Sequence, residues 1–227
     1  MFTLHQNPEK DMLLAANKRV QSRKEELFNG ISHGLGLVAA ILAMPFLIIE
    51  AIHVGDAGFL VGVTVFCSTV ILLYLTSTIY HLLTREKVKR VFRVFDHSAI
   101  FLLIAGTYTP FTLGVFKGAL GWSFFGIIWG IAAIGIAMKI VFKAQYPIVS
   151  TMLYLLMGWI IIFALKPLVA LVPPLGIAWL VAGGVFYTLG VAFYAFDSQF
   201  RYSHFIWHLF VMAGTFCHYF AVYGYAY

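Results

Sequence analysis

The 227-residue chain is 62% hydrophobic and only 11% charged, whereas a soluble globular domain carries roughly 25% charged residues. A chain this apolar cannot cover itself with a polar surface, so its composition excludes a soluble protein and predicts that lipid is its solvent. The formal net charge of +6 does not indicate a nucleic-acid partner, because the basic residues are segregated along the chain.

Seven stretches without Asp, Glu, Lys or Arg, each at least 20 residues long, divide the sequence. They are residues 27–49, 57–84, 97–116, 118–138, 144–165, 167–196 and 202–227. About 20 helical residues cross a hydrocarbon core about 30 Å thick. The stretches do not alternate in polarity as membrane strands do. The sequence therefore predicts an all-α integral membrane bundle of seven transmembrane helices.

In chain order, residues 1–26 are polar and charged, which does not fit a cleavable signal peptide. They are expected to form a cytoplasmic segment, helical near 11–26, ahead of a transmembrane domain at 27–227. The expected spans are residues 28–52, 59–83, 95–116, 121–141, 148–165, 175–196 and 204–223. The expected connections include a strongly basic loop at 84–93 and a loop with three prolines at 166–174.

The basic residues predict the orientation of the bundle. With the N-terminus in the cytoplasm, 13 of the 15 Lys and Arg residues lie inside, and only Lys117 and Lys166 lie outside. Cytoplasmic loops carry such an excess of Lys and Arg, so we expect a cytoplasmic N-terminus and an external C-terminus. Anionic lipid is a sufficient partner for the basic runs. Cys67 and Cys217 fall within spans and form neither a disulfide framework nor a cysteine zinc site.

Ionisable side chains in membrane spans are costly and mark functional sites, and most of those here lie near the cytoplasmic ends. His204 and His208 are four residues apart, so they share a helix face and suit one metal ion. Ser77 and His81 repeat this spacing, and Asp96 adds a carboxylate at the same depth. Three histidines and a water make a zinc site with an open position, although other divalent transition metals also fit.

Glu26, Asn29 and His33 share one face of the first span. They either support the metal ligands from a neighbouring helix or simply begin a helix with a favourable acidic residue. His97 has the same depth as Asp96 but faces about 100° away, so only one of the two is expected to face the site, and Asp96 is preferred. His53 and His218 lie nearer the outer ends and are expected to be interfacial.

These residues resemble the haemolysin III group, the bacterial branch of the progestin and adipoQ receptor family, over about residues 20–225. Three motifs carry the resemblance. They are Glu26-x-x-Asn29-x-x-x-His33; Ser77-x-x-x-His81, continued by Asp96 and the run Asp-His-Ser-Ala-Ile-Phe-Leu-Leu-Ile-Ala-Gly-Thr-Tyr-Thr-Pro that ends at Pro110; and His204-x-x-x-His208.

The resemblance implies seven spans, an intracellular N-terminus and zinc held by His81, His204 and His208. It also places Asp96 beside a water on the zinc, with Ser77 nearby. The wider family includes receptor-like proteins and alkaline ceramidases, so it implies metal-dependent hydrolysis of lipid amides. The bacterial branch is linked by name to haemolysis and otherwise to membrane-lipid homeostasis, which favours a multi-pass protein of a bacterial inner membrane.

The leading hypothesis is a zinc-dependent hydrolase of a lipid-like amide or ester. Asp96 would accept the proton of water, Ser77 would stabilise the developing oxyanion or orient the water, and a lipid tail would lie between helices. The main alternative is a membrane sensor or receptor-like protein in which zinc only fastens helices together. A pore-forming cytolysin is disfavoured because the chain shows no secretion signal. Transport is disfavoured because no pair of broken helices meets at the midplane.

Overall fold

The computed structural model describes residues 19–227, which are all-helical and joined by short connections. The elements are α2 (Arg23–Val54), α3 (Ala57–Leu82), α4 (Glu86–Pro110), η1 (Phe111–Val115), α5 (Gly118–Val141), α6 (Pro147–Trp159), η2 (Ile160–Ala164), α7 (Leu165–Leu171), α8 (Pro174–Ala195) and α9 (Ser203–Tyr225). Within residues 19–227, seven helical segments are long and apolar enough to cross a membrane. The predicted seven-helix membrane fold is therefore confirmed.

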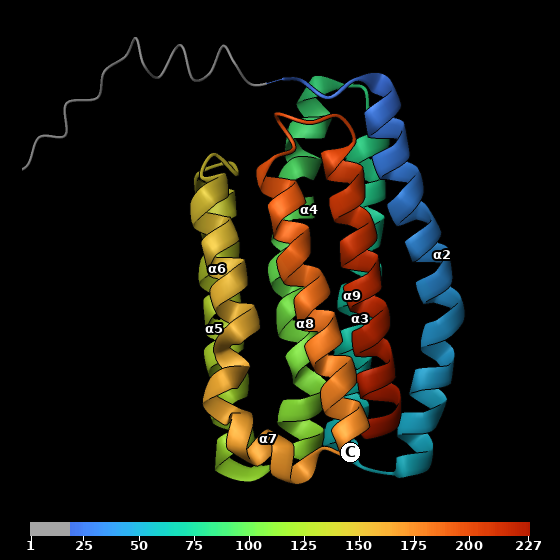
Figure 1. Cartoon of the computed structure of the whole chain (residues 1–227), viewed down its shortest axis with the longest axis vertical. Coiled ribbons are helices and arrows are strands. Elements are labelled where there is room, and N and C mark those ends of the chain that lie inside the picture. Colours follow the sequence, from blue (N-terminus) through green and yellow to red (C-terminus); the bar gives the residue numbers. More distant parts are fainter. Residues whose placement is uncertain (1–18) are drawn as a thin grey trace, which may run out of the picture.

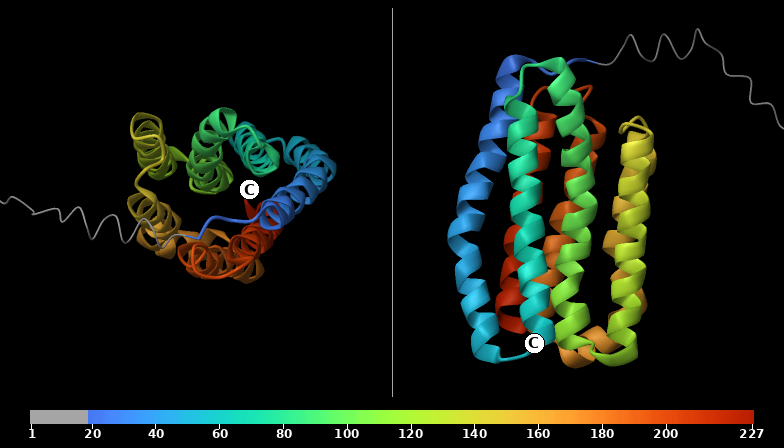
Figure 2. Two further views of the ribbon diagram at one scale, coloured as in Figure 1. Left: turned by 90° about the horizontal axis from the view of Figure 1, so that it is seen from above. Right: turned by 180° about the vertical axis from the view of Figure 1, so that it is seen from behind.

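The long helices run side by side along one axis (Figure 1) and form a ring when they are viewed from one end (Figure 2). In the ring α2 packs against α3 and α9, α3 packs against α4, and α8 packs against α9. α5 and α6 stand together at one side, and α7 lies across the lower end in Figure 1. α2 begins at the upper end, called the N-terminal end below, and the chain finishes at the opposite end.

Two expected loops are in fact helical, so the prediction was wrong there. α4 begins at Glu86 rather than near residue 95. The basic stretch 86–93 is rich in Lys and Arg, which are good helix formers, and Val88, Val91 and Phe92 lie between them. At the opposite end the chain stays helical through α7 to Leu171. Pro167 does not prevent this, because it lies in the first turn of α7, where no backbone donor is lost.

The start of α2 is tied to the connection between α8 and α9. Ser22 caps the helix, because its Oγ accepts a hydrogen bond from Glu25 N and its backbone N–H donates to the Glu25 carboxylate. Arg19 pairs with the same carboxylate at 2.7 Å and donates to the Phe200 carbonyl at 2.9 Å. The Tyr202 N–H also donates to Glu25. These contacts place the first turns of α2 and α9 next to each other.

α3 and α4 approach each other closely through small residues. A side chain at Gly106 of α4 would overlap Thr69 of α3, and one at Gly62 of α3 would overlap the backbone at Pro110. Helices in lipid associate largely through such small-residue packing. This close contact fixes the relative heights of the end of α3 and the start of α4, where the polar residues gather.

Candidate metal centre

Three histidines meet inside the N-terminal end of the bundle. His81 lies in the last turn of α3, and His204 and His208 lie in the first two turns of α9. All three are buried, and each offers one ligand atom within 4.8 Å of the others. They form the one such group of three or more potential ligands in the described part of the chain. The predicted i, i+4 pair on α9 and the predicted partner on α3 are thus brought together.

Carboxylates orient two of the three rings. His81 Nδ1 lies 2.7 Å from Glu26 Oε2, and His204 Nδ1 lies 3.1 Å from Asp197 Oδ2. A neutral imidazole has one N–H donor and one acceptor nitrogen. A ring that donates from Nδ1 to a carboxylate therefore keeps its Nε2 lone pair free. Histidines that bind metals are typically held in this way by an acceptor on the far side of the ring.

The third ring is held by α2. His208 Nδ1 lies 3.2 Å from the Asn29 carbonyl and 3.1 Å from Ser32 Oγ. Ser32 donates its own proton to the same carbonyl at 2.8 Å, so its oxygen accepts from the ring. His33, one turn further along α2, stacks on His208 with ring centroids 3.6 Å apart and planes at 6°. The α2 face therefore fixes both the tautomer and the tilt of the His208 ring.

The donor set fits zinc. The Nε2 atoms of His81, His204 and His208 are all buried and have no hydrogen-bond partner within residues 19–227. Three inward-facing imidazole lone pairs without a proton donor are a costly arrangement unless a cation takes them. Neutral imidazoles oriented by carboxylates are typical zinc ligands.

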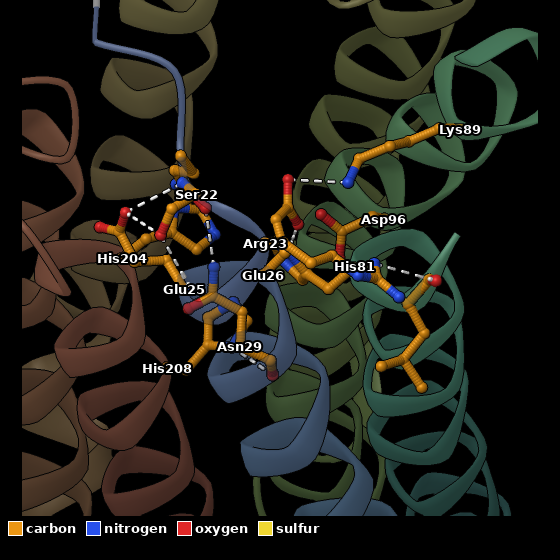
Figure 3. A network of polar contacts seen from close by, with 12 residues as sticks. Ser22, Arg23, Glu25, Glu26, Asn29, His81, Lys89, Asp96, His204 and His208 are labelled. Atoms are coloured by element: carbon orange, nitrogen blue, oxygen red, sulfur yellow. Dashed lines mark hydrogen bonds and ion pairs between the residues drawn. The ribbon is translucent and has the colours of Figure 1, made fainter. Parts of the chain in front are cut away.

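Asp96 and Ser77 lie beside this group. Asp96, on α4, is 3% exposed and lies near His204, Ser77 and Glu26; Figure 3 shows the polar residues around it from close by. Ser77 precedes His81 by one turn of α3 and is fully buried, and its Oγ has no hydrogen-bond partner in the described chain. The neighbouring His97 is half-buried, and its Nε2 lies 3.8 Å from Asp96 Oδ2, too far for a hydrogen bond.

The three α2 residues of the first motif have different contacts. Glu26 binds His81 directly, and its second oxygen lies 2.7 Å from Lys89 Nζ. Asn29 reaches His208 through its backbone carbonyl, while its side-chain amide donates to Gln21. Both ring nitrogens of His33 are buried without a partner in residues 19–227.

Sequence reasoning did not single out Asp197 and Ser32. Asp197 is the one carboxylate in the short connection before α9, and this is the signal that was available. Ser32 contributes an ordinary hydroxyl, and nothing in the sequence distinguishes it from the other serines of the spans. Both residues touch a metal-group histidine directly.

A largely apolar cavity of about 340 Å³ starts at Asp96 and His33 and runs toward the opposite end. Its walls come mainly from α4, α6, α8 and α9. On the side between α6 and α8 its rim includes exposed residues such as Trp159, Ile162 and Val181, so the cavity opens to the lipid-facing surface. His218 also lines it and is only 7% exposed, so the expectation that His218 is interfacial was wrong. His53 is exposed.

A second pocket, of about 460 Å³, lies at the N-terminal end on the other side of Glu26. Its charged lining residues are Arg23, Glu26, Glu86, Lys89, Arg90 and Arg93. Four cations and two carboxylates make this pocket positive. The histidine group therefore lies between a positive polar pocket and a long apolar cavity.

Known proteins are similar to this chain over most of its length. The family model described as Haemolysin-III related matches residues 21–219. The Hemolysin-3 homolog of Bacillus subtilis (strain 168) is 44% identical over 199 residues, which cover 88% of this chain and 93% of that protein. Hemolysin-3 of Bacillus cereus is 43% identical over 205 residues, covering 90% and 93%. The human monocyte to macrophage differentiation factor is 30% identical over 167 residues, covering 68% and 66%. The chain belongs to the haemolysin III family.

Proposed function

We propose that this haemolysin III family protein is a zinc-dependent hydrolase that cleaves an amide or ester bond of a membrane lipid. One observation supports this most strongly. Three buried histidine Nε2 atoms without a partner in the described chain converge near Asp96, and Asp96, though none of the three histidines, lines an apolar cavity that opens to lipid. Such a pocket, apolar with a few convergent polar groups, is the usual form of a small-molecule site.

His81, His204 and His208 would hold the zinc. When bound, zinc supplies Lewis-acid chemistry that polarises a carbonyl and makes water a nucleophile near neutral pH. Asp96 would take the proton of the attacking water on its carboxylate and pass it to the leaving nitrogen or oxygen as the acyl bond breaks. The Ser77 hydroxyl would donate a hydrogen bond to the carbonyl oxygen as negative charge develops there. Glu26 and Asn29 would keep the ligand rings oriented.

The cavity supports a lipid substrate. Asp96 and Phe111 both line it and lie 15 residues apart along α4 and η1, which is about 22 Å of helix. An extended chain advances about 1.2 Å per bond, so the cavity takes an acyl chain of about 18 carbons. The opening between α6 and α8 would admit this chain from the bilayer. A polar head would then remain at the N-terminal end, next to the basic pocket.

The site is proposed to face the cytoplasm of a bacterium. The histidine end carries the basic start of α4, and Lys and Arg are enriched on cytoplasmic sides. The bacterial relatives are consistent with a bacterial membrane, and we propose the inner membrane. A role in membrane-lipid homeostasis follows if the enzyme removes or remodels a lipid of its own bilayer.

A structural zinc is the second candidate function. α3 and α9 have few direct backbone contacts, yet the metal group joins His81 of α3 to two residues of α9. An ion there would fasten the two helices and add folding free energy without turnover. The protein would then be a membrane sensor or receptor-like protein.

Three variants separate these functions. Purified wild-type protein, prepared without chelators, is expected to hold about one zinc per chain by elemental analysis. The double variant His204→Ala/His208→Ala is expected to lose the zinc, whereas His53→Ala, which changes an exposed histidine far from the group, keeps it. Asp96→Asn is then assayed against a panel of lipid amides and esters.

The hydrolase proposal expects Asp96→Asn to lose turnover by about a hundredfold or more while it keeps zinc and melting temperature. The structural alternative expects no turnover in wild-type protein and a lower melting temperature when zinc is removed. Wild-type protein that holds no zinc would refute both.

A further inference from the structure

His218 is a polar group that the proposed reaction does not use. It lies on α9, lines the apolar cavity and is 7% exposed. His204 and His218 lie on the same face of α9, because they are separated by 14 residues, close to four full turns. The ring thus points into the bundle from the half of α9 that is further from the metal group.

No described residue satisfies this ring. Nδ1 is buried without a hydrogen-bond partner in residues 19–227. Tyr187 packs against the ring, with centroids 5.2 Å apart. The Tyr187 hydroxyl is already bonded to Thr215 Oγ1 at 2.9 Å. An unpaired imidazole in an apolar cavity is costly, which indicates that a ligand completes it.

α8 leaves space for the ring. Gly183 faces His218, and a Cβ added there would lie 2.6 Å from His218 Nε2. Because Gly183 has no side chain, the imidazole fits between α8 and α9 beside the cavity. Any larger residue at position 183 would push the ring away from its present place.

The position of His218 along α9 sets its distance from the metal group. His218 follows His208 by ten residues, so the two lie about 15 Å apart along the axis of α9. An extended acyl chain advances about 1.2 Å per bond. A lipid whose reacting carbonyl lies at the metal group therefore passes His218 about twelve bonds along its chain.

We propose that His218 binds a hydroxyl group carried by the acyl chain about twelve bonds from its polar end. A neutral imidazole has one donor and one acceptor, and a hydroxyl group is likewise both, so it satisfies either nitrogen that faces it. The cavity thus selects hydroxylated acyl chains over plain ones of the same length. This deepens the proposed function by specifying its substrate class, and it rests on that function only for which end of the lipid reacts.

The test measures binding and needs no turnover. The probes are octadecanoic acid, 12-hydroxyoctadecanoic acid and 2-hydroxyoctadecanoic acid. Affinity is read from the fluorescence of the purified protein in detergent, because Trp159 and Trp207 line the cavity. The variant His218→Phe keeps a ring of similar size and removes the hydrogen bond. Tyr187→Phe is the matched control, because the hydroxyl that it removes is bonded to Thr215 rather than to a ligand.

Wild-type protein and Tyr187→Phe are expected to bind the 12-hydroxy acid about fivefold more tightly than octadecanoic acid, the gain of one hydrogen bond. His218→Phe is expected to lose this preference and to bind octadecanoic acid within about twofold of wild type. His218→Gln, which retains a donor and an acceptor, is expected to keep part of the preference. The 2-hydroxy acid should bind His218→Phe and wild type equally.

The proposal is overturned if wild-type protein shows no preference for the 12-hydroxy acid, if His218→Phe keeps it, or if neither acid binds. Failure of the hydrolase proposal has a different signature. In that case the preference survives in wild-type protein, while none of the corresponding amides or esters is cleaved.

Discussion

Replacing Glu26 with glutamine tests how strongly the metal group depends on the helix that surrounds it. The Glu26 carboxylate lies 2.7 Å from His81 Nδ1 with one oxygen and 2.7 Å from Lys89 Nζ with the other. Glutamine preserves the size of the side chain but has one acceptor oxygen. It can therefore accept from His81 or from Lys89, and the amide nitrogen repels whichever donor remains.

The expected effect is a loss of zinc affinity. Removing the carboxylate that orients a metal-binding histidine costs about 10- to 100-fold in affinity, which is about 1.4–2.7 kcal/mol. Asp197→Asn makes the same change on His204 and is expected to cost less, near tenfold. The Asp197 contact is longer, at 3.1 Å, and its side chain is 30% exposed against 16% for Glu26, so water already shares its hydrogen bonds.

Competition with a zinc chelator measures the affinity of each purified variant. Glu86→Gln is the matched control, because Glu86 lines the same basic pocket as Glu26 and is not among the groups that contact the three histidines. Its zinc affinity should equal that of wild type. Equal affinities for Glu26→Gln and wild type, or equal losses for Glu26→Gln and Glu86→Gln, would refute the argument that the Glu26–His81 contact organises the site.

Three further outcomes are expected. His33→Ala removes the ring stacked on His208, worth about 0.5–1.5 kcal/mol, so zinc affinity should fall by roughly 2- to 10-fold while elemental analysis still finds one zinc. Gly106→Ala should lower the free energy of unfolding by about 1–3 kcal/mol, because the new methyl overlaps Thr69, whereas Gly126→Ala meets nothing within 4 Å and should not lower the melting temperature. Lys117 lowers the pKa of Asp56 through a hydrogen bond of 2.8 Å. Because Asn caps a helix about as well as Asp, Asp56→Asn should lose only this exposed ion pair, at most about 1 kcal/mol. A carboxyl group whose pKa is lower in the folded protein stabilises the fold at pH values above its pKa in the unfolded chain, about 3.9. The difference in melting temperature between wild type and Asp56→Asn should therefore be present at pH 7 and vanish as the pH falls below about 4.

The spacing of His204 and His208 was sufficient to predict that they face one centre, because helix geometry alone decides it. His81 was predictable by depth, since the charge-free stretches fix the height of each span end. Asp197 was not predictable in this way, because its position depends on the backbone conformation of the connection between α8 and α9. The contact made by Asn29 could not be inferred from residue type, because its backbone carbonyl, rather than its amide, reaches His208.

His218 shows a different kind of error. Its depth along the span, taken alone, predicts an interfacial residue. The buried residues of α9 include Val211, Thr215, His218 and Val222, which follow His204 and His208 at steps of three and four. That spacing places His218 on the inward face of α9. The periodicity of the helix therefore predicts that His218 is buried, which its depth in the span does not.

The unpaired polar atoms of the bundle indicate that both the metal group and His218 bind a ligand. In a membrane interior water does not satisfy a buried donor or acceptor, so such atoms need a partner from the protein or a ligand. In the described chain, most of the buried side-chain atoms without a hydrogen bond belong to residues near the N-terminal end, and the three Nε2 atoms of the metal group are among them. His218 Nδ1 is the exception, since it lies deeper along the cavity. A cation explains the three Nε2 atoms, because their lone pairs converge. It cannot explain a solitary ring in an apolar cavity, which calls for a hydrogen-bonding group on the lipid itself.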